Sequence, residues 1–301
     1  MSRSARLLAL SGLGATVLLW SSAFVAIRVA LRDLDPLQLT VGRLLVASAA
    51  LAVVAPLLDV GRPARRDLTR LVLAGATGMT GYQLLLNTGQ VRVPAGTASL
   101  LVATFPVLTA ILGGLVLGER LAADQWTGVA VAFTGAGLIA LTERDGLGIS
   151  PSALLVLGAA ACLAAYAVLQ KPLLARVSPV TATCHATWAA TALALPLAGR
   201  LPAALDRVTA AGVVALLWLG VGASAVGFVT WAVALRHLSA SVAASSLYLV
   251  PPLTVMIAWG LLGERPVPVA LAGGALCLVG VLLTQRSGHP RQAPTRTSSH
   301  T

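Results

Sequence analysis

Charged and aromatic residues are scarce in this chain. Of its 301 residues, only 10% are Asp, Glu, Lys or Arg and only 4% are aromatic, whereas about 25% of the residues of a soluble domain are charged. This scarcity excludes an ordinary soluble globular domain. The hydrophobic share is 57%, rich in the small aliphatic residues that let helices approach closely in a bilayer. The composition therefore predicts a bundle of transmembrane helices surrounded by membrane lipid.

Cysteines are few, and catalytic motifs are missing. Cys162, Cys184 and Cys277 lie in apolar stretches without paired spacing, so neither a disulfide framework nor a metal site is expected. The sequence contains no G-x-S-x-G, no H-E-x-x-H and no Gly-rich phosphate loop, the motifs of nucleophilic, zinc and phosphate chemistry. We therefore expect no cofactor, no metal and no enzyme activity. An intramembrane enzyme, a channel and an assembly subunit stay open as alternatives.

Apolar runs of about 20 residues, bounded by Gly, Pro or charged residues, divide the chain into ten predicted spans. Five lie near residues 7–30, 37–58, 69–91, 95–118 and 122–141. The other five lie near residues 152–174, 179–198, 209–235, 240–262 and 267–284. Ten helices can enclose a pathway on their own, so we expect a monomer.

The net charge of +11 is explained by topology. The basic residues are scattered singly through the joints between spans, a pattern that does not favour nucleic-acid binding. With the N-terminus inside, thirteen Lys and Arg residues fall in cytoplasmic segments and seven in outer ones. This excess predicts a multi-pass protein of a bacterial inner membrane with both termini cytoplasmic. Residues 286–301 are expected to form a disordered cytoplasmic tail.

The sequence also repeats itself. A shift of 145 residues aligns FPVLT at 105–109 with VPPLT at 250–254, and LGER at 117–120 with LGER at 262–265. A shift of 143 residues aligns Arg28 with Lys171 and Pro36 with Pro179. Each copy holds an odd number of spans, so the second enters the membrane from the opposite side. The prediction is an all-α membrane protein of ten transmembrane helices in two inverted five-helix repeats, residues 1–143 and 150–285.

An inverted repeat is typical of carriers that work by alternating access at a midplane cavity. The sequence also carries motifs of a known family. The run from Trp20 to Arg28, WSSAFVAIR, resembles the W-G-x-x-F-x-x-x-K/R signature of the EamA-type members of the drug/metabolite transporter superfamily, with Ser21 in place of Gly. RLLVA at 43–47 resembles the family's R-F-x-x-A, and AYAVLQK at 165–171 resembles the corresponding second-half motif. The resemblance covers residues 7–284 and implies a secondary carrier, commonly an exporter, of amino acids, other metabolites or drugs.

A small-molecule site is expected among the polar and aromatic residues inside the spans. Such residues supply the few handles of an otherwise apolar pocket. Arg43 lies about two turns inside its helix, where a charge is costly unless it is paired or faces a wet cavity. Helix packing is the alternative role for each member. The candidates are Trp20, Ser22, Arg43, Tyr82, Asn87, Tyr166, His185, Trp231, Ser245 and Tyr248.

Hinge or gate residues are expected at matching places in the two repeats. Pro106 and Pro251 interrupt their helices, which frees backbone carbonyls where the repeats meet. Glu119 and Glu264 each follow a Gly that ends a helix, so each carboxylate can face the positive end of a helix dipole. All ten acidic residues fall in joints or at helix ends. A carboxylate relay at the middle of the membrane, and a strongly cationic substrate, are therefore disfavoured.

Overall fold

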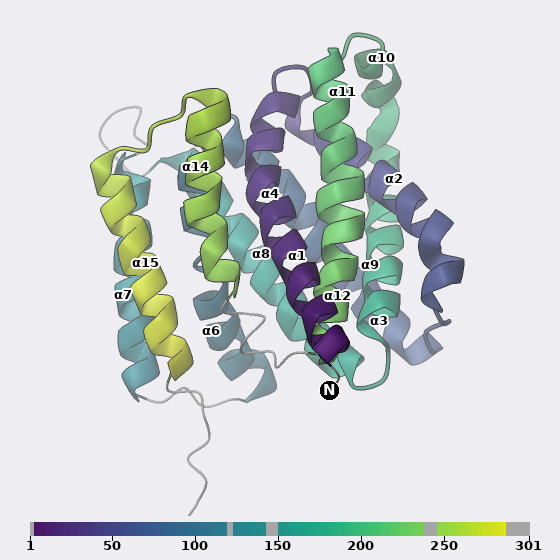
Figure 1. The fold of residues 1–301 in the computed structure, drawn as a ribbon, viewed down its shortest axis with the longest axis horizontal. Coiled ribbons are helices and arrows are strands. Elements are labelled where there is room, and N and C mark those ends of the chain that lie inside the picture. The colour runs from purple at the N-terminus through teal and green to yellow at the C-terminus, as the bar shows by residue number, and fades with distance from the viewer. Residues whose placement is uncertain (1–2, 119–122, 143–149, 238–245, 287–301) are drawn as a thin grey trace, which may run out of the picture.

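A computed structural model describes residues 3–118, 123–142, 150–237 and 246–286, and helices are the only regular elements within those ranges (Figure 1). The first half contains α1 (Arg3–Ala30), α2 (Pro36–Val54), η1 (Ala55–Leu58), α3 (Arg65–Gly75), η2 (Ala76–Gly81), α4 (Tyr82–Gln90), α5 (Ala95–Val102), α6 (Phe105–Leu117) and α7 (Ala123–Thr142). The second half contains α8 (Pro151–Leu174), α9 (Pro179–Ala194), η3 (Leu195–Arg200), α10 (Leu201–Leu205), α11 (Ala210–Leu217), η4 (Trp218–Val226), α12 (Gly227–His237), η5 (Leu247–Leu249), α14 (Val250–Leu262) and α15 (Pro268–Arg286). The predicted all-helical class is confirmed for these residues. The expected tail, apart from Arg286, lies outside them.

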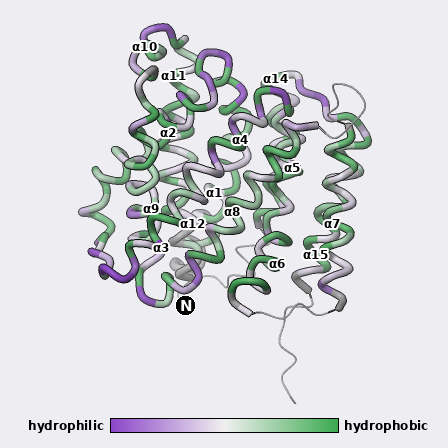
Figure 2. Tube along the Cα trace, turned by 180° about the vertical axis from the view of Figure 1, so that it is seen from behind, coloured by the Kyte–Doolittle hydropathy of each residue, from purple (hydrophilic) through white to green (hydrophobic). Residues whose placement is uncertain are grey.

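The outer surface of the bundle is apolar, as a lipid-facing surface must be. Five segments are long and apolar enough to cross a membrane: Ala9–Ala30, Pro36–Leu58, Ala95–Val116, Pro151–Leu174 and Ala210–Trp231. Leu57 and Leu115 are 83% and 78% exposed, a degree of exposure that water would penalise when repeated over many side chains. Hydrophilic residues gather toward the two ends of the bundle (Figure 2). The chain is therefore a multi-pass membrane protein.

Two helices at corresponding places in the halves begin in the same way. Asp35 precedes Pro36 at the start of α2, and its carboxylate accepts hydrogen bonds from the backbone of Leu37 and Gln38. Ser178 precedes Pro179 at the start of α9, and its hydroxyl accepts from the backbone of Thr181. A capping side chain followed by Pro satisfies or removes the free N–H groups of a first helical turn.

The closest helix packing joins elements that are equivalent by the sequence repeat. α7 and α15 lie side by side (Figure 1), and an added Cβ on Gly135 would meet the backbone oxygen of Gly273, as one on Gly128 would meet that of Gly280. Cys277, 145 residues after Ala132, donates to its carbonyl at 3.3 Å. Small residues allow this close backbone approach in lipid.

A second such contact lies between α2 and α9. The hydroxyls of Ser48 and Thr191, which are 143 residues apart, are hydrogen-bonded at 2.6 Å. The Thr191 hydroxyl also lies 3.2 Å from the carbonyl oxygen of Leu44. Both contacts therefore join helices that are equivalent by the sequence repeat, one from each half.

Several helices are irregular near the middle of the bundle. α5 ends at Val102 and α6 begins at Phe105 with Pro106 in its first turn, and α14 has Pro251 at the equivalent place. The elements η2 and η4 are π-helical turns, also at corresponding places in the two halves. Inserted π turns are frequent at functional sites because they re-aim side chains. Here η2 ends directly before Tyr82, and η4 contains Ser224.

Candidate functional site

A cavity of about 220 Å³ lies at the centre of the bundle. It is far larger than the ~30 Å³ that one water molecule occupies in the liquid, and it has room for a small solute. Both halves of the chain line it. Its wall includes Trp20, Phe24 and Ile27 of α1, Arg43 of α2, Gly78 and Met79 of η2, Tyr82, Gln83 and Leu86 of α4, Ser99 and Val102 of α5, Leu163, Tyr166 and Gln170 of α8, Phe228 and Trp231 of α12, and Val250 and Pro251 of α14.

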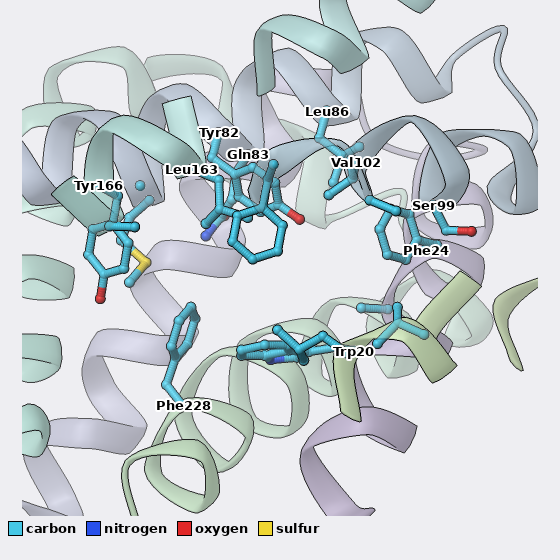
Figure 3. A pocket seen from close by; sticks show the side chains of 18 of the residues that line it. Trp20, Phe24, Tyr82, Gln83, Leu86, Ser99, Val102, Leu163, Tyr166 and Phe228 are labelled. Carbon is cyan, nitrogen blue, oxygen red and sulfur yellow. The ribbon is translucent and has the colours of Figure 1, made fainter. Parts of the chain in front are cut away.

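One side of the cavity is an aromatic wall. The Trp20 ring lies 5.4 Å from the Phe228 ring, edge to face, and 5.6 Å from the Trp231 ring. The Trp20 indole N–H donates to the carbonyl of Ala223 at 3.1 Å, so its polar atom is satisfied and its ring face is left for apolar contact. Trp20 and Phe228 face Tyr82, Gln83 and Leu163 across the space (Figure 3).

Among the described residues that line the cavity, Arg43 is the only charged one. It is 5% exposed, and its Nε donates to the Ser224 hydroxyl at 2.9 Å. No carboxylate of the described residues forms an ion pair with it. A buried guanidinium that lacks an anionic partner is costly in a membrane. Its terminal nitrogens are therefore open to an anionic group of a solute.

The wall opposite Trp20 is built by close packing of α8 on η2. A Cβ added to Gly78 would overlap the Tyr166 ring, so this ring lies directly on the glycine. The Tyr166 hydroxyl accepts a hydrogen bond from Nε2 of Gln170 at 2.7 Å. Gln83 is 2% exposed, and its Oε1 accepts no hydrogen bond from any residue that the structure describes.

Beyond the cavity, a polar cluster joins four helix ends. Arg28 at the end of α1 forms an ion pair with Glu264 at 2.9 Å and donates to the backbone oxygens of Gln90 at 2.6 Å and Val91 at 3.0 Å. The second Glu264 oxygen accepts from the backbone N–H of Ala95 at 2.7 Å. The carboxylate thus faces the positive end of a helix dipole, as expected, but the helix is α5 rather than the following α15.

A second ion pair lies at the opposite end of the bundle. Asp67 in the first turn of α3 pairs with Arg176, which follows α8. The hydrogen bond from Arg176 holds the pKa of the buried Asp67 carboxyl below its usual value. Asp33 after α1 accepts from the backbone N–H of Thr209 at 3.0 Å, just before α11. In each half, the end of the first helix is therefore bound to the start of the third predicted span of the other half: α1 to α11, and α8 to α3.

The predicted site residues fall into three groups. Those that line the cavity are Trp20, Arg43, Tyr82, Tyr166, Trp231 and Pro251. Those that the structure places elsewhere are Ser22, Asn87, His185, Tyr248, Pro106 and Glu264. Those that lie outside the described residues are Glu119 and Ser245.

The predicted residues outside the cavity have local contacts. Ser22 accepts from the Trp218 indole at 3.0 Å, and Asn87 donates to the Thr40 hydroxyl at 2.9 Å. His185 lies 2.9 Å from the carbonyl oxygen of Thr181 in its own helix. Tyr248 packs against the apolar cluster around Val107. Contacts of this kind agree with helix packing, the alternative role that the sequence left open for these four residues.

Sequence reasoning missed Gln83, Ser224 and Phe228. A signal existed for Gln83, because Gln83, Asn87 and Gln90 follow a spacing of four and three residues and so share one face of α4. No such signal existed for Ser224. Its contact with Arg43 joins residues 181 positions apart in the sequence.

Comparison with known proteins agrees with the geometry. The model of the EamA-like transporter family matches residues 7–141 and 150–286. A probable terminal-alkyne amino-acid exporter of Streptantibioticus cattleyicolor is 45% identical over 93% of this chain and 95% of its own. A probable amino-acid metabolite efflux pump of Salmonella typhimurium is 31% identical over 89% and 91%. One crystal structure shares the fold, with a TM-score of 0.61 and 20% identity over 95% of this chain and 98% of that chain. On these matches, and with a cavity lined by both of its halves, the chain belongs to the EamA-like transporter family.

Proposed function

We propose that this transporter exports an α-amino acid with an apolar side chain across the bacterial inner membrane. The observation that carries the proposal is the cavity, in which one buried cation, Arg43, stands among aromatic and aliphatic side chains. A carboxylate supplies the negative charge that Arg43 lacks, and the wall around Trp20 and Phe228 suits an apolar side chain. The names of the two amino-acid exporting relatives support the same substrate class and direction.

The proposed mechanism is alternating access between two inverted five-helix repeats, residues 1–143 and 150–285. The reciprocal contacts of α7 with α15 and of α2 with α9 support it, since a two-fold axis in the membrane plane would relate each pair. Ten spans follow if the five long apolar segments are joined by the shorter apolar helices at 125–141, 247–262 and 268–284, by α3 to α4, and by α9. The unit that transports is proposed to be a monomer with both termini in the cytoplasm.

We place the Arg28–Glu264 cluster at the outer face, where it closes the pathway in this conformation. Arg28 lies one turn beyond Phe24 and directly after Ile27, which both line the cavity. It joins the ends of α1, α4, α5 and α14. The proposed hinges are at Pro106 and Pro251, which lie in the first turns of α6 and α14. α5 ends at Val102 before α6 begins, and the 3₁₀ turn η5 leads directly into α14. Opening outward requires this cluster to separate.

Release of amino acids from cells tests this function. Cells that produce the protein are fed alanyl dipeptides of leucine, norvaline or propargylglycine, whose hydrolysis raises the internal free amino acid. We expect the wild type to raise the rate of appearance of at least one of the three in the medium severalfold. Arg43→Ala should lower that gain at least tenfold, because a buried charged hydrogen bond contributes about 1.5–3 kcal/mol. Equal release by the wild type, by Arg43→Ala at matched membrane amounts and by empty cells would contradict the proposal.

A further inference from the structure

Two buried polar side chains at the cavity have atoms without a hydrogen bond to any described residue, and their chemistry is complementary. Arg43 carries a full positive charge and uses only Nε in a hydrogen bond, so its two terminal nitrogens offer donors alone. Gln83 has a neutral side-chain amide, and its Oε1 atom has no hydrogen-bond partner within the described ranges. Buried polar groups are almost always satisfied, so each such exception calls for a reason. A ligand bound in the cavity would provide hydrogen-bond partners for both side chains.

The two side chains lie at the same level of the bundle. Asn87 on α4 donates to Thr40 on α2 at 2.9 Å, which fixes the register of these two helices. The helices are antiparallel, since α3 and α4 return in the direction opposite to α2 (Figure 1). Gln83 is one turn before Asn87 and Arg43 is about one turn after Thr40, so both lie one turn from that bond in the same direction. Both line the cavity.

We propose that Arg43 and Gln83 bind the two ends of a zwitterion. Arg43 takes the α-carboxylate through its terminal nitrogens, and the Gln83 side-chain oxygen accepts a hydrogen bond from the α-ammonium. The amide can turn over to present this oxygen, since its two ends have nearly the same shape. The proposal rests on the proposed function and adds the selectivity of the site. The site should prefer an intact α-amino acid to an amine that lacks the carboxylate and to an acid that lacks the ammonium.

A neutral acceptor for the ammonium fits the rest of the cavity. None of the described lining residues is a carboxylate, so an ammonium finds no ion-pair partner among them. An amine without a carboxylate would meet the charge of Arg43 instead. An acid without an ammonium would leave the Gln83 amide unpaired. A buried polar group left without its partner gives strong discrimination against the analogue that lacks it.

Binding to the purified protein in detergent tests this selectivity by calorimetry. The ligands are L-propargylglycine, pent-4-ynoate, which lacks the ammonium, and but-3-ynylamine, which lacks the carboxylate. We expect the wild type to bind the amino acid at least tenfold more tightly than either analogue. In Gln83→Leu the preference over pent-4-ynoate should disappear, whereas the preference over but-3-ynylamine should persist. Gln83→Glu should keep the preference over pent-4-ynoate, because a carboxylate also accepts from an ammonium.

Thr97→Val is the matched control, because it removes another buried oxygen without a partner, at a place outside the cavity. It should leave all three affinities unchanged. The inference is overturned if the wild type binds the amino acid no more tightly than pent-4-ynoate. It is also overturned if Gln83→Leu weakens the binding of L-propargylglycine and of pent-4-ynoate by the same factor. Selective binding without any release from cells would instead contradict the proposed function and leave the zwitterion site standing.

Discussion

At the scale of single residues, the site depends on side chains whose isolation in the sequence is itself a signal. Arg43 was predictable, because a charge two turns inside an apolar helix must face something polar. In the structure Arg43 lines the cavity, and its Nε donates to the Ser224 hydroxyl. The Ser224 hydroxyl that holds its Nε was not predictable, since a serine in a membrane helix usually bonds back to its own backbone. His185 has such a contact, with the Thr181 carbonyl.

Gly78 gives a residue-scale prediction. An added methyl group would overlap the Tyr166 ring and push it toward the cavity, and such overpacking typically costs about 1–3 kcal/mol. Gly78→Ala should therefore lower both the melting temperature and the affinity for L-propargylglycine. Gly137→Ala is the control, because no atom lies within 4 Å of its added Cβ. If the two variants behave alike in thermal unfolding and in calorimetry, the packing of Tyr166 on Gly78 does not shape the site.

At the scale of the elements, helix breaks and joints were easier to predict than pairings. α6 and α14 each begin with a proline in the first turn, Pro106 and Pro251, where its lost N–H and fixed φ are tolerated. Gly118 and Gly263 end their helices at φ of 71° and 69°, where other residues are strained. Sequence alone could not show that Glu264 faces the start of α5. That contact joins residues 169 positions apart and depends on how the two halves fold together.

The packing of α7 on α15 gives an element-scale prediction. Gly135 and Gly273 bring the two backbones into contact, so a large side chain there must force the helices apart. Gly135→Leu should lower the melting temperature by several degrees and reduce transport. Gly137→Leu, two residues further along the same helix and exposed, should do neither. An unchanged melting temperature in Gly135→Leu, measured in the same detergent, would contradict the tight crossing.

At the scale of the whole molecule, the architecture was more predictable than the site. The repeated LGER motif and the recurring prolines predict two related halves, and the family match covers residues in each. The cavity could not be outlined in the same way, because its wall, among the described residues, draws side chains from eight α-helices, one π turn and one 3₁₀ turn. Trp20, Tyr82 and Trp231 were found because aromatic residues are rare here. Gln83 was missed because glutamine in a membrane helix also serves in packing.

The most direct measurement of the central claim, that the protein is an amino-acid carrier, is counterflow in proteoliposomes. Vesicles loaded with unlabelled L-propargylglycine are diluted into a trace of the labelled amino acid. A carrier that reorients with its substrate should give a transient accumulation of label above equilibrium that saturates with concentration and is lost in Arg43→Ala. Label that only equilibrates, at a rate proportional to concentration, would indicate a channel. Absence of uptake by folded wild-type protein would contradict the amino-acid carrier itself.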